Sequence, residues 1–121
     1  MTKQEWKRKI VRQCKAAGTY KPFFVSAIET LSSILEQRDL SQEAFEEGGS
    51  QPVVIHVNKA GEANPTKNPA LLMILDCNTQ ALAYWRELGL TSKSWQAMMK
   101  EERLNGEKKD TLEDALSKLG I

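Results

Sequence analysis

Residues 68–89 have the sequence NPALLMILDCNTQALAYWRELG, which predicts one long and central helix. Asn68 is a favoured N-cap, Pro69 suits the first helical position, and Gly89 suits the residue just after a helix. One apolar seam, interrupted by Asn78, contains Leu71, Leu75, Leu82 and Trp85. A second seam contains Ile74, Cys77, Ala81, Tyr84 and Leu88. A helix that is apolar on two sides is central in its own fold or buries one side in a partner.

More helices are predicted on the N-terminal side of this stretch. Residues 3–17 are apolar on one side and basic on another, and Gly18 ends the helix. A second helix over 22–37 begins at Pro22, and a short helix over 41–47 follows before two glycines. The apolar residues of the second helix are spaced 4, 3 and 4 apart, which is typical of a coiled coil: Phe24, Ile28, Leu31 and Leu35.

The sequence predicts one small β-hairpin over residues 52–67. The run PVVIHV over 52–57 is rich in β-branched residues, and residues 58–61 form a turn that leads to a return strand. An isolated hairpin is marginally stable, so we expect it to pack on helices or on a neighbouring subunit. Beyond the central helix, Thr91 caps a further helix, a polar linker covers 105–109, and Asp110 starts a last short helix.

The predicted fold class is therefore a mainly α-helical bundle with one small β-hairpin, which oligomerises through its long helices. At 121 residues the chain has room for one domain, and we assign residues 1–104 to it. That domain comprises an N-terminal helical hairpin with a basic face (1–38), the β-hairpin (52–67) and the central helix with its successor (68–104). Residues 105–121 form the linker and the C-terminal short helix.

Charge is segregated along the chain, although the net charge is only +1. Residues 1–21 carry a net charge of +6, residues 22–51 carry −5, and the remainder is neutral. A basic stripe suits a phosphate backbone, and it is also compatible with a solvated face or with pairing to the acidic segment. The candidate DNA-binding residues are Lys3, Lys7, Arg8, Lys9, Arg12, Lys15 and Lys21.

Several classes of protein are disfavoured by what the sequence lacks. No run of about 18 apolar residues exists to span a membrane, and no phosphate-binding loop exists to hydrolyse ATP. The two cysteines are far apart and there is a single histidine, His56, so we expect no metal site, no cofactor and no catalytic residues. Distant, unpaired cysteines are typical of reduced thiols in a cytosolic protein.

Two short motifs flank the central helix. The segment Asn68-Pro-Ala-Leu precedes it and Glu87-Leu-Gly-Leu-Thr91 follows it. In this order and spacing, the chain resembles a family of tailed-phage terminase small subunits over roughly residues 3–99. It departs from the family pattern at Ser92, where the family usually has proline, and at Trp95, near a family arginine. If that arginine is the family's DNA contact, the N-terminal helix is the better candidate in this chain.

The resemblance implies a non-catalytic, mainly helical and ring-forming protein of phage DNA packaging. Such a protein recognises double-stranded viral DNA in the cytoplasm of the bacterial host, and it regulates a large subunit that carries the ATPase and nuclease. Repetition of one basic patch around a ring raises the effective affinity of a nearly neutral protomer. We expect the subunit interface to involve Phe24, Ile28, Leu31, Leu35, Leu71, Leu75, Asn78, Leu82 and Trp85.

Two other functions fit the residues. Residues 3–37 would serve as a helix-turn-helix in a DNA-binding transcriptional regulator, which would be a dimer. A purely structural oligomerisation module would instead pair the basic helix with an acidic neighbour. The mass of the assembly separates a ring from a dimer.

Overall fold

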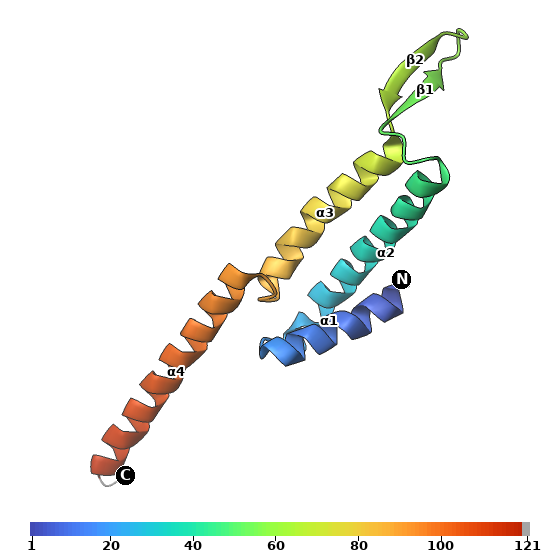
Figure 1. The fold of residues 1–121 in the computed structure, drawn as a ribbon. Coiled ribbons are helices and arrows are strands. Elements are labelled where there is room, and N and C mark those ends of the chain that lie inside the picture. The colour runs from blue at the N-terminus through green and yellow to red at the C-terminus, as the bar shows by residue number, and fades with distance from the viewer. Residues whose placement is uncertain (120–121) are drawn as a thin grey trace.

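The computed structural model of the chain describes residues 1–119, apart from the side chains of residues 109 and 110. It contains α1 (Lys3–Ala17), the short 3-10 helix η1 (Pro22–Phe24), α2 (Val25–Glu47), β1 (Val53–Val57), β2 (Ala63–Lys67), α3 (Pro69–Glu87) and α4 (Ser92–Lys118). Helices α2 and α3 lie side by side, α1 crosses them at one end, and the hairpin projects from the other end (Figure 1). Helix α4 continues away from the end of α3 (Figure 1). The predicted class, mainly helical with one β-hairpin, is confirmed.

Helix α3 has the ends that the sequence predicts. The Oδ1 atom of Asn68 accepts a hydrogen bond of 3.0 Å from the Ala70 amide, and Pro69 occupies the first turn. At the other end Gly89 has a positive φ of 69°, and the Leu90 amide donates to the Trp85 carbonyl at 2.9 Å. A left-handed residue followed by a bond back into the last turn is a common helix ending, and it suits glycine.

Helix α2 corrects the prediction of two separate helices over 22–37 and 41–47. A single helix runs from Val25 to Glu47, and Pro22 lies in η1 just before it. Residues 38–40 contain neither glycine nor proline, so no local feature stops the backbone hydrogen bonds there. The helix ends where Gly48 and Gly49 follow it.

Helix α4 corrects the predicted linker over 105–109 and the separate short helix from Asp110. One helix runs through Ser92–Lys118, so Asn105 and Gly106 lie in its interior. A single glycine in a helix costs about 1 kcal/mol relative to alanine. That cost is insufficient to break a helix whose neighbouring residues include strong helix formers such as Leu104 and Glu107.

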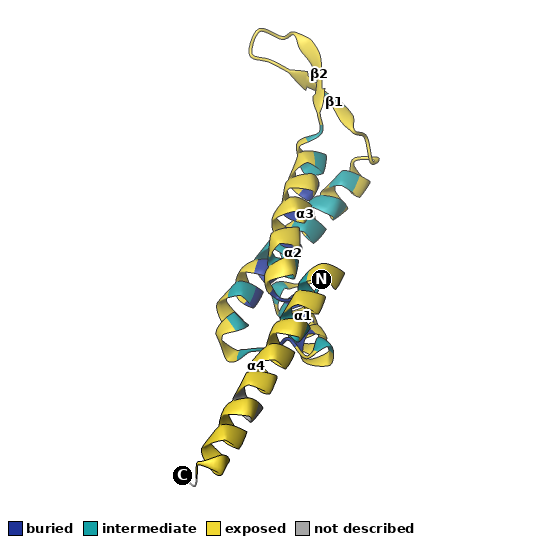
Figure 2. Ribbon diagram, turned by 90° about the vertical axis from the view of Figure 1, so that its left-hand side faces the viewer, coloured by how far each residue is buried: buried dark blue, intermediate teal, exposed yellow. Residues whose placement is uncertain are grey.

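The core lies where α1 crosses α2 and α3. It contains Trp6, Ile10, Cys14, Ile28, Leu31, Leu35, Ala81 and Leu88. Both cysteines are unpaired and buried, and burial raises the pKa of each thiol. The hairpin and most of α4 are exposed, as the yellow ribbon in Figure 2 shows. Within residues 1–119 no helix is both long and apolar enough to span a bilayer.

Candidate nucleic-acid interface and subunit surface

Helix α1 divides its residues between the core and a basic outer face. Its buried side consists of Trp6, Ile10 and Cys14. On the outer side, Arg8, Arg12 and Lys15 are exposed and follow one another at spacings of four and three residues. This spacing places them along one helix face. We call these three residues the basic stripe.

The N-terminal part of the basic stripe borders a shallow hollow of about 350 Å³. It is lined by Met1, Glu5, Arg8, Lys9 and Arg12. Among the ion pairs found in residues 1–119, none involves a member of the basic stripe. The Arg8 Nε atom donates to the Gln4 carbonyl at 3.4 Å, so the terminal nitrogen atoms of both guanidinium groups remain available to an external anion.

Four of the predicted basic residues, including Lys15 of the basic stripe, contact other groups of the chain, whereas no ion pair within residues 1–119 involves the Lys3 side chain. Lys7 forms an ion pair of 3.5 Å with Glu29 of α2. The ammonium groups of Lys9, Lys15 and Lys21 lie 5.0, 5.1 and 5.9 Å from the ring centres of Trp6, Tyr20 and Phe23, respectively. These aromatic contacts position the charge without neutralising it. Pairing with the acidic segment, which the sequence left open, thus occurs for the Lys7 side chain.

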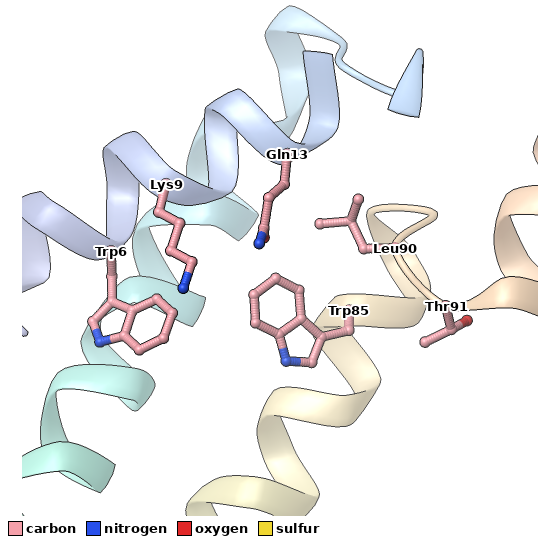
Figure 3. A pocket seen from close by; sticks show the side chains of 6 residues that line it. All are labelled: Trp6, Lys9, Gln13, Trp85, Leu90 and Thr91. Carbon is pink, nitrogen blue, oxygen red and sulfur yellow. The ribbon is translucent and has the colours of Figure 1, made fainter. Parts of the chain in front are cut away.

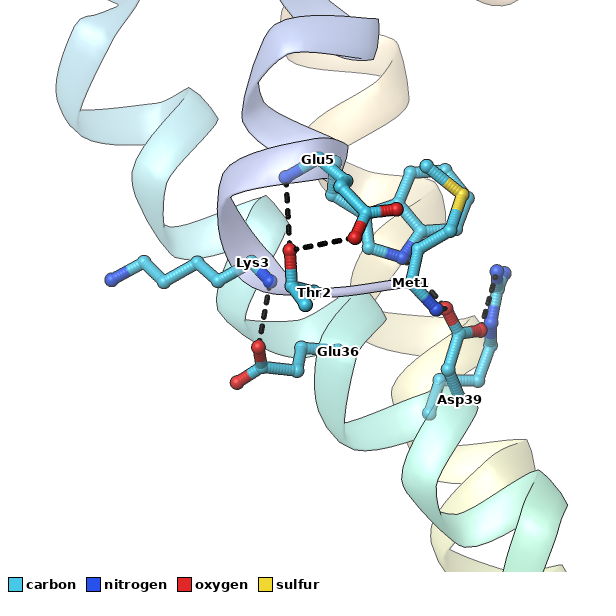
Figure 4. Close-up of polar contacts among 8 residues, drawn as sticks. Met1, Thr2, Lys3, Glu5, Glu36 and Asp39 are labelled. Carbon is cyan, nitrogen blue, oxygen red and sulfur yellow. Dashed lines mark hydrogen bonds and ion pairs between the residues drawn. The ribbon is translucent and has the colours of Figure 1, made fainter.

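The backbone of Lys3 and the carboxylates of α2 fix the start of α1. The Lys3 amide donates to Glu36 Oε2 at 2.6 Å, and the N-terminal ammonium lies 3.0 Å from Asp39 Oδ2 (Figure 4). Thr2 acts as the N-cap by accepting from the Glu5 amide (Figure 4). Carboxylates near a helix N-terminus are favourable, because the first amides of a helix carry partial positive charge.

Asp39 also accepts a 2.7 Å hydrogen bond from the indole Nε1 of Trp6. Burial opposes its ionisation, but the bonds from Trp6 and the N-terminus, together with nearby Arg38, outweigh burial and lower the pKa of Asp39. Asp39 is not among the site residues predicted from the sequence. The available signal was chemical, because a buried tryptophan usually needs an acceptor for its N–H.

Two hollows lie beside the corner between α3 and α4. The larger, of about 500 Å³, is lined by Trp6, Lys9, Gln13, Trp85, Leu90 and Thr91 (Figure 3). In the smaller, of about 370 Å³, Trp95 donates from Nε1 to the Ala17 carbonyl at 2.8 Å, which ties α4 to the end of α1. In the part of the chain that the structure describes, no cluster of three His, Cys, Asp or Glu side chains could hold a metal ion.

The structure separates the predicted interface residues into two groups. Ile28, Leu31 and Leu35 are at most 1% exposed, so they are core residues of one chain and have no surface left for a second subunit. This corrects the prediction for α2, because α2 packs between α1 and α3 and uses its apolar seam there. Phe24 and Trp85 are half-buried against the same core.

Helix α3 presents the remaining predicted interface residues on an outer face. Leu75 is 55% exposed and Leu82 is 42% exposed, with exposed Asn78 between them and half-buried Leu71 before them. We call Leu71, Leu75, Asn78 and Leu82 the outer seam of α3. The other apolar seam of α3, which contains Ile74, Cys77 and Ala81, is buried within the chain.

A comparison with family models finds one described as phage terminase, small subunit, which matches residues 2–104. The match runs from α1 through the first half of α4 and includes both the basic stripe and the outer seam. No curated protein and no solved structure matches the chain.

Proposed function

Because the chain belongs to the phage terminase small-subunit family and has a role in phage DNA packaging, we propose that it is a DNA-binding adaptor. In this proposal it binds double-stranded viral DNA through α1 and acts as a homo-oligomer, which we expect to be a ring. It regulates the large subunit, and the ATPase and nuclease activities belong to that partner.

The observation that carries the DNA contact is the exposed and unneutralised basic stripe. Arg8 and Arg12 are free to approach phosphates, and guanidinium groups bind phosphate oxygens in a paired, planar geometry. The anchoring of α1 by Trp6 and Asp39 orders the stripe before DNA arrives, so less conformational entropy is lost on binding. Contacts of this kind position DNA without reading its sequence.

The outer seam of α3 supports the proposed assembly. Two large leucines exposed at a spacing of seven residues form the kind of seam along which helices associate. Asn78 lies between them, where a polar residue can fix the register and number of associating helices. Each copy then contributes one modest basic patch, and repetition supplies the affinity that a single patch lacks.

Helix α2 fits poorly as the recognition helix of a helix-turn-helix regulator. Its exposed charged residues are all acidic, namely Glu29, Glu43, Glu46 and Glu47. Its one basic residue, Arg38, lies 3.4 Å from Asp39 and stacks over Trp6. An acidic surface repels DNA phosphates, so we assign the DNA contact to α1 alone.

The test of the proposed DNA contact reverses the basic stripe with Arg8→Glu, Arg12→Glu and Lys15→Glu together. We expect double-stranded DNA binding to weaken at least tenfold, because phosphate-neutralising groups become repulsive. The slope of log affinity against log salt should also flatten by about three for each bound protomer. Fluorescence anisotropy with labelled duplex DNA over a range of salt concentrations measures both quantities.

A matched control carries the same change in charge on α4, with Lys93→Glu, Lys100→Glu and Lys118→Glu. All three of these lysines are exposed and lie outside α1. The control should retain most of the affinity and salt slope. Equal losses in the two variants would mean that bulk charge drives binding, and the assignment to the basic stripe would be wrong.

A further inference from the structure

The β1–β2 hairpin stands clear of the helices and is almost wholly exposed. Figures 1 and 2 show it projecting beyond the ends of α2 and α3. Val53, Ile55 and Val57 of β1 are 52%, 66% and 60% exposed, although they are three of the four apolar residues of the strand. A two-stranded hairpin alone is marginally stable in water, and a packed or extended sheet is more stable.

The hydrogen bonds at both ends of the hairpin fix which backbone groups face outward. The Asn68 amide donates to the Pro52 carbonyl at 2.9 Å, and the Asn58 amide donates to the Glu62 carbonyl at 3.0 Å. Bonded and non-bonded pairs alternate along an antiparallel ladder. In the observed register, Val54 and His56 are therefore bonded within the hairpin, whereas Val53, Ile55 and Val57 direct their N–H and C=O groups outward.

The two outer edges differ in chemistry. On β2, the outward residues are Ala63, Pro65 and Lys67. Proline has no N–H to donate and a charged lysine discourages strand addition, so this edge is protected. The β1 edge has neither a proline nor a charged residue among its outward residues. These residues are β-branched, and each has both a backbone N–H and a C=O to offer.

We propose that the β1 edge pairs antiparallel with the β1 edge of a second copy, in a register centred on Ile55. Ile55 then lies opposite the Ile55 of the second copy, and Val53 lies opposite its Val57. Every outward N–H and C=O of the two strands meets a partner in this register, because each outward-facing residue lies opposite an outward-facing residue of the second copy. The β-branched side chains of the two copies also become cross-strand neighbours, which stabilises the sheet.

A second β1 strand fits this edge better than the β2 strand of another copy. Opposite β2, the proline would leave the central carbonyl of β1 without a donor. Pairing of like edges is a two-fold contact, whereas the contact proposed for α3 builds a ring. Together they predict two rings joined face to face through their hairpins. Each strand contact is small, and repetition around the ring strengthens it.

The experiment compares Ile55→Pro with Ile55→Ala in the full chain. Proline at this position removes an outward N–H and no bond within the hairpin, since Ile55 and Pro65 form a non-bonded pair of the ladder. Alanine shortens the side chain and keeps the N–H. By light scattering over a range of concentrations, we expect Ile55→Pro to halve the mass of the assembly. We expect the dissociation constant of the Ile55→Ala assembly to be at least tenfold lower than that of Ile55→Pro.

Amide hydrogen exchange of the wild-type chain provides a second readout that needs no variant. At concentrations where the assembly persists, the Val53, Ile55 and Val57 amides should exchange slowly, and dilution should accelerate them. The Val54 and His56 amides should show protection that changes far less with dilution. Rapid exchange of the Ile55 amide at every concentration, or an unchanged mass for Ile55→Pro, would overturn the pairing. Neither measurement involves DNA, so that result would leave the function proposed for α1 standing.

Discussion

Replacing Leu75 and Leu82 with glutamate is expected to dissociate the assembly into protomers of 13.6 kDa, apart from any pairs held by the hairpins. Both leucines are exposed in the single chain, so the substitutions leave the intrachain core untouched. In an assembly they would bury carboxylates in an apolar seam, where an unpaired charge costs several kcal/mol at each site. Because every contact around a ring is affected, the loss is cumulative. Light scattering after size-exclusion chromatography measures the mass.

The matched control places the same two charges elsewhere on α3, with Gln80→Glu and Ala83→Glu. Both positions are exposed and lie away from the outer seam. The control should assemble like the wild-type chain, and both variants should retain wild-type helical content by circular dichroism. If Leu75→Glu with Leu82→Glu keeps the full mass, the outer seam is not the subunit interface.

Replacing Gly89 with alanine is expected to lower the free energy of unfolding by about 2–4 kcal/mol. A Cβ atom there would lie 2.5 Å from Met98 Sδ and 2.8 Å from Thr19 Cγ2. The methionine can move, but Thr19 is only 1% exposed and β-branched, so its methyl group cannot give way easily. The positive φ of 69° adds backbone strain. Urea unfolding followed by circular dichroism measures the change.

Gly18→Ala separates the two contributions. Gly18 has a similar φ of 77°, but no atom lies within 4 Å of the Cβ that would be added. Its substitution should therefore cost only the backbone strain of about 1–2 kcal/mol. Adding Thr19→Ser to Gly89→Ala removes the obstructing methyl group and should recover part of the loss. Equal costs for the two glycine variants would show that close packing at Gly89 contributes nothing.

The elements that sequence predicts well are those with strong signals at both ends. Asn68, Pro69 and Gly89 bound α3, and Gly18 ends α1. These signals act through the local backbone and need no information about neighbours in space. The sequence predicts two separate helices where α2 and α4 are each continuous. A polar segment such as 105–109 suggests a linker, although every residue in it tolerates a helix. The polar composition of such a segment favours a loop, but a helix ends only where a local feature, such as a proline or a pair of glycines, interrupts its backbone hydrogen bonds.

The candidate sites needed tertiary information that periodicity does not contain. The seams of α2 and α3 look equally suited to a partner in sequence, yet Leu31 is buried in the chain and Leu75 is exposed. The position at which α1 crosses α2 and α3 determines which seam is buried in the core of the single chain. Likewise, the pairing of Lys7 with Glu29 and the anchoring of Trp6 by Asp39 join α1 and α2 across a turn. Charge counting indicates attraction between these segments without identifying the partners.

In the proposed function, the affinity for DNA comes from one basic stripe per copy, repeated by assembly. The most direct measurement compares duplex DNA affinity at one salt concentration between wild type and the variant with Leu75→Glu and Leu82→Glu. Both carry Arg8, Arg12 and Lys15 unchanged, and the variant with Gln80→Glu and Ala83→Glu corrects for the added charge. We predict that loss of assembly weakens binding by about 10²–10⁴-fold. A dissociated protomer that binds DNA as tightly as the assembled control would contradict the claim.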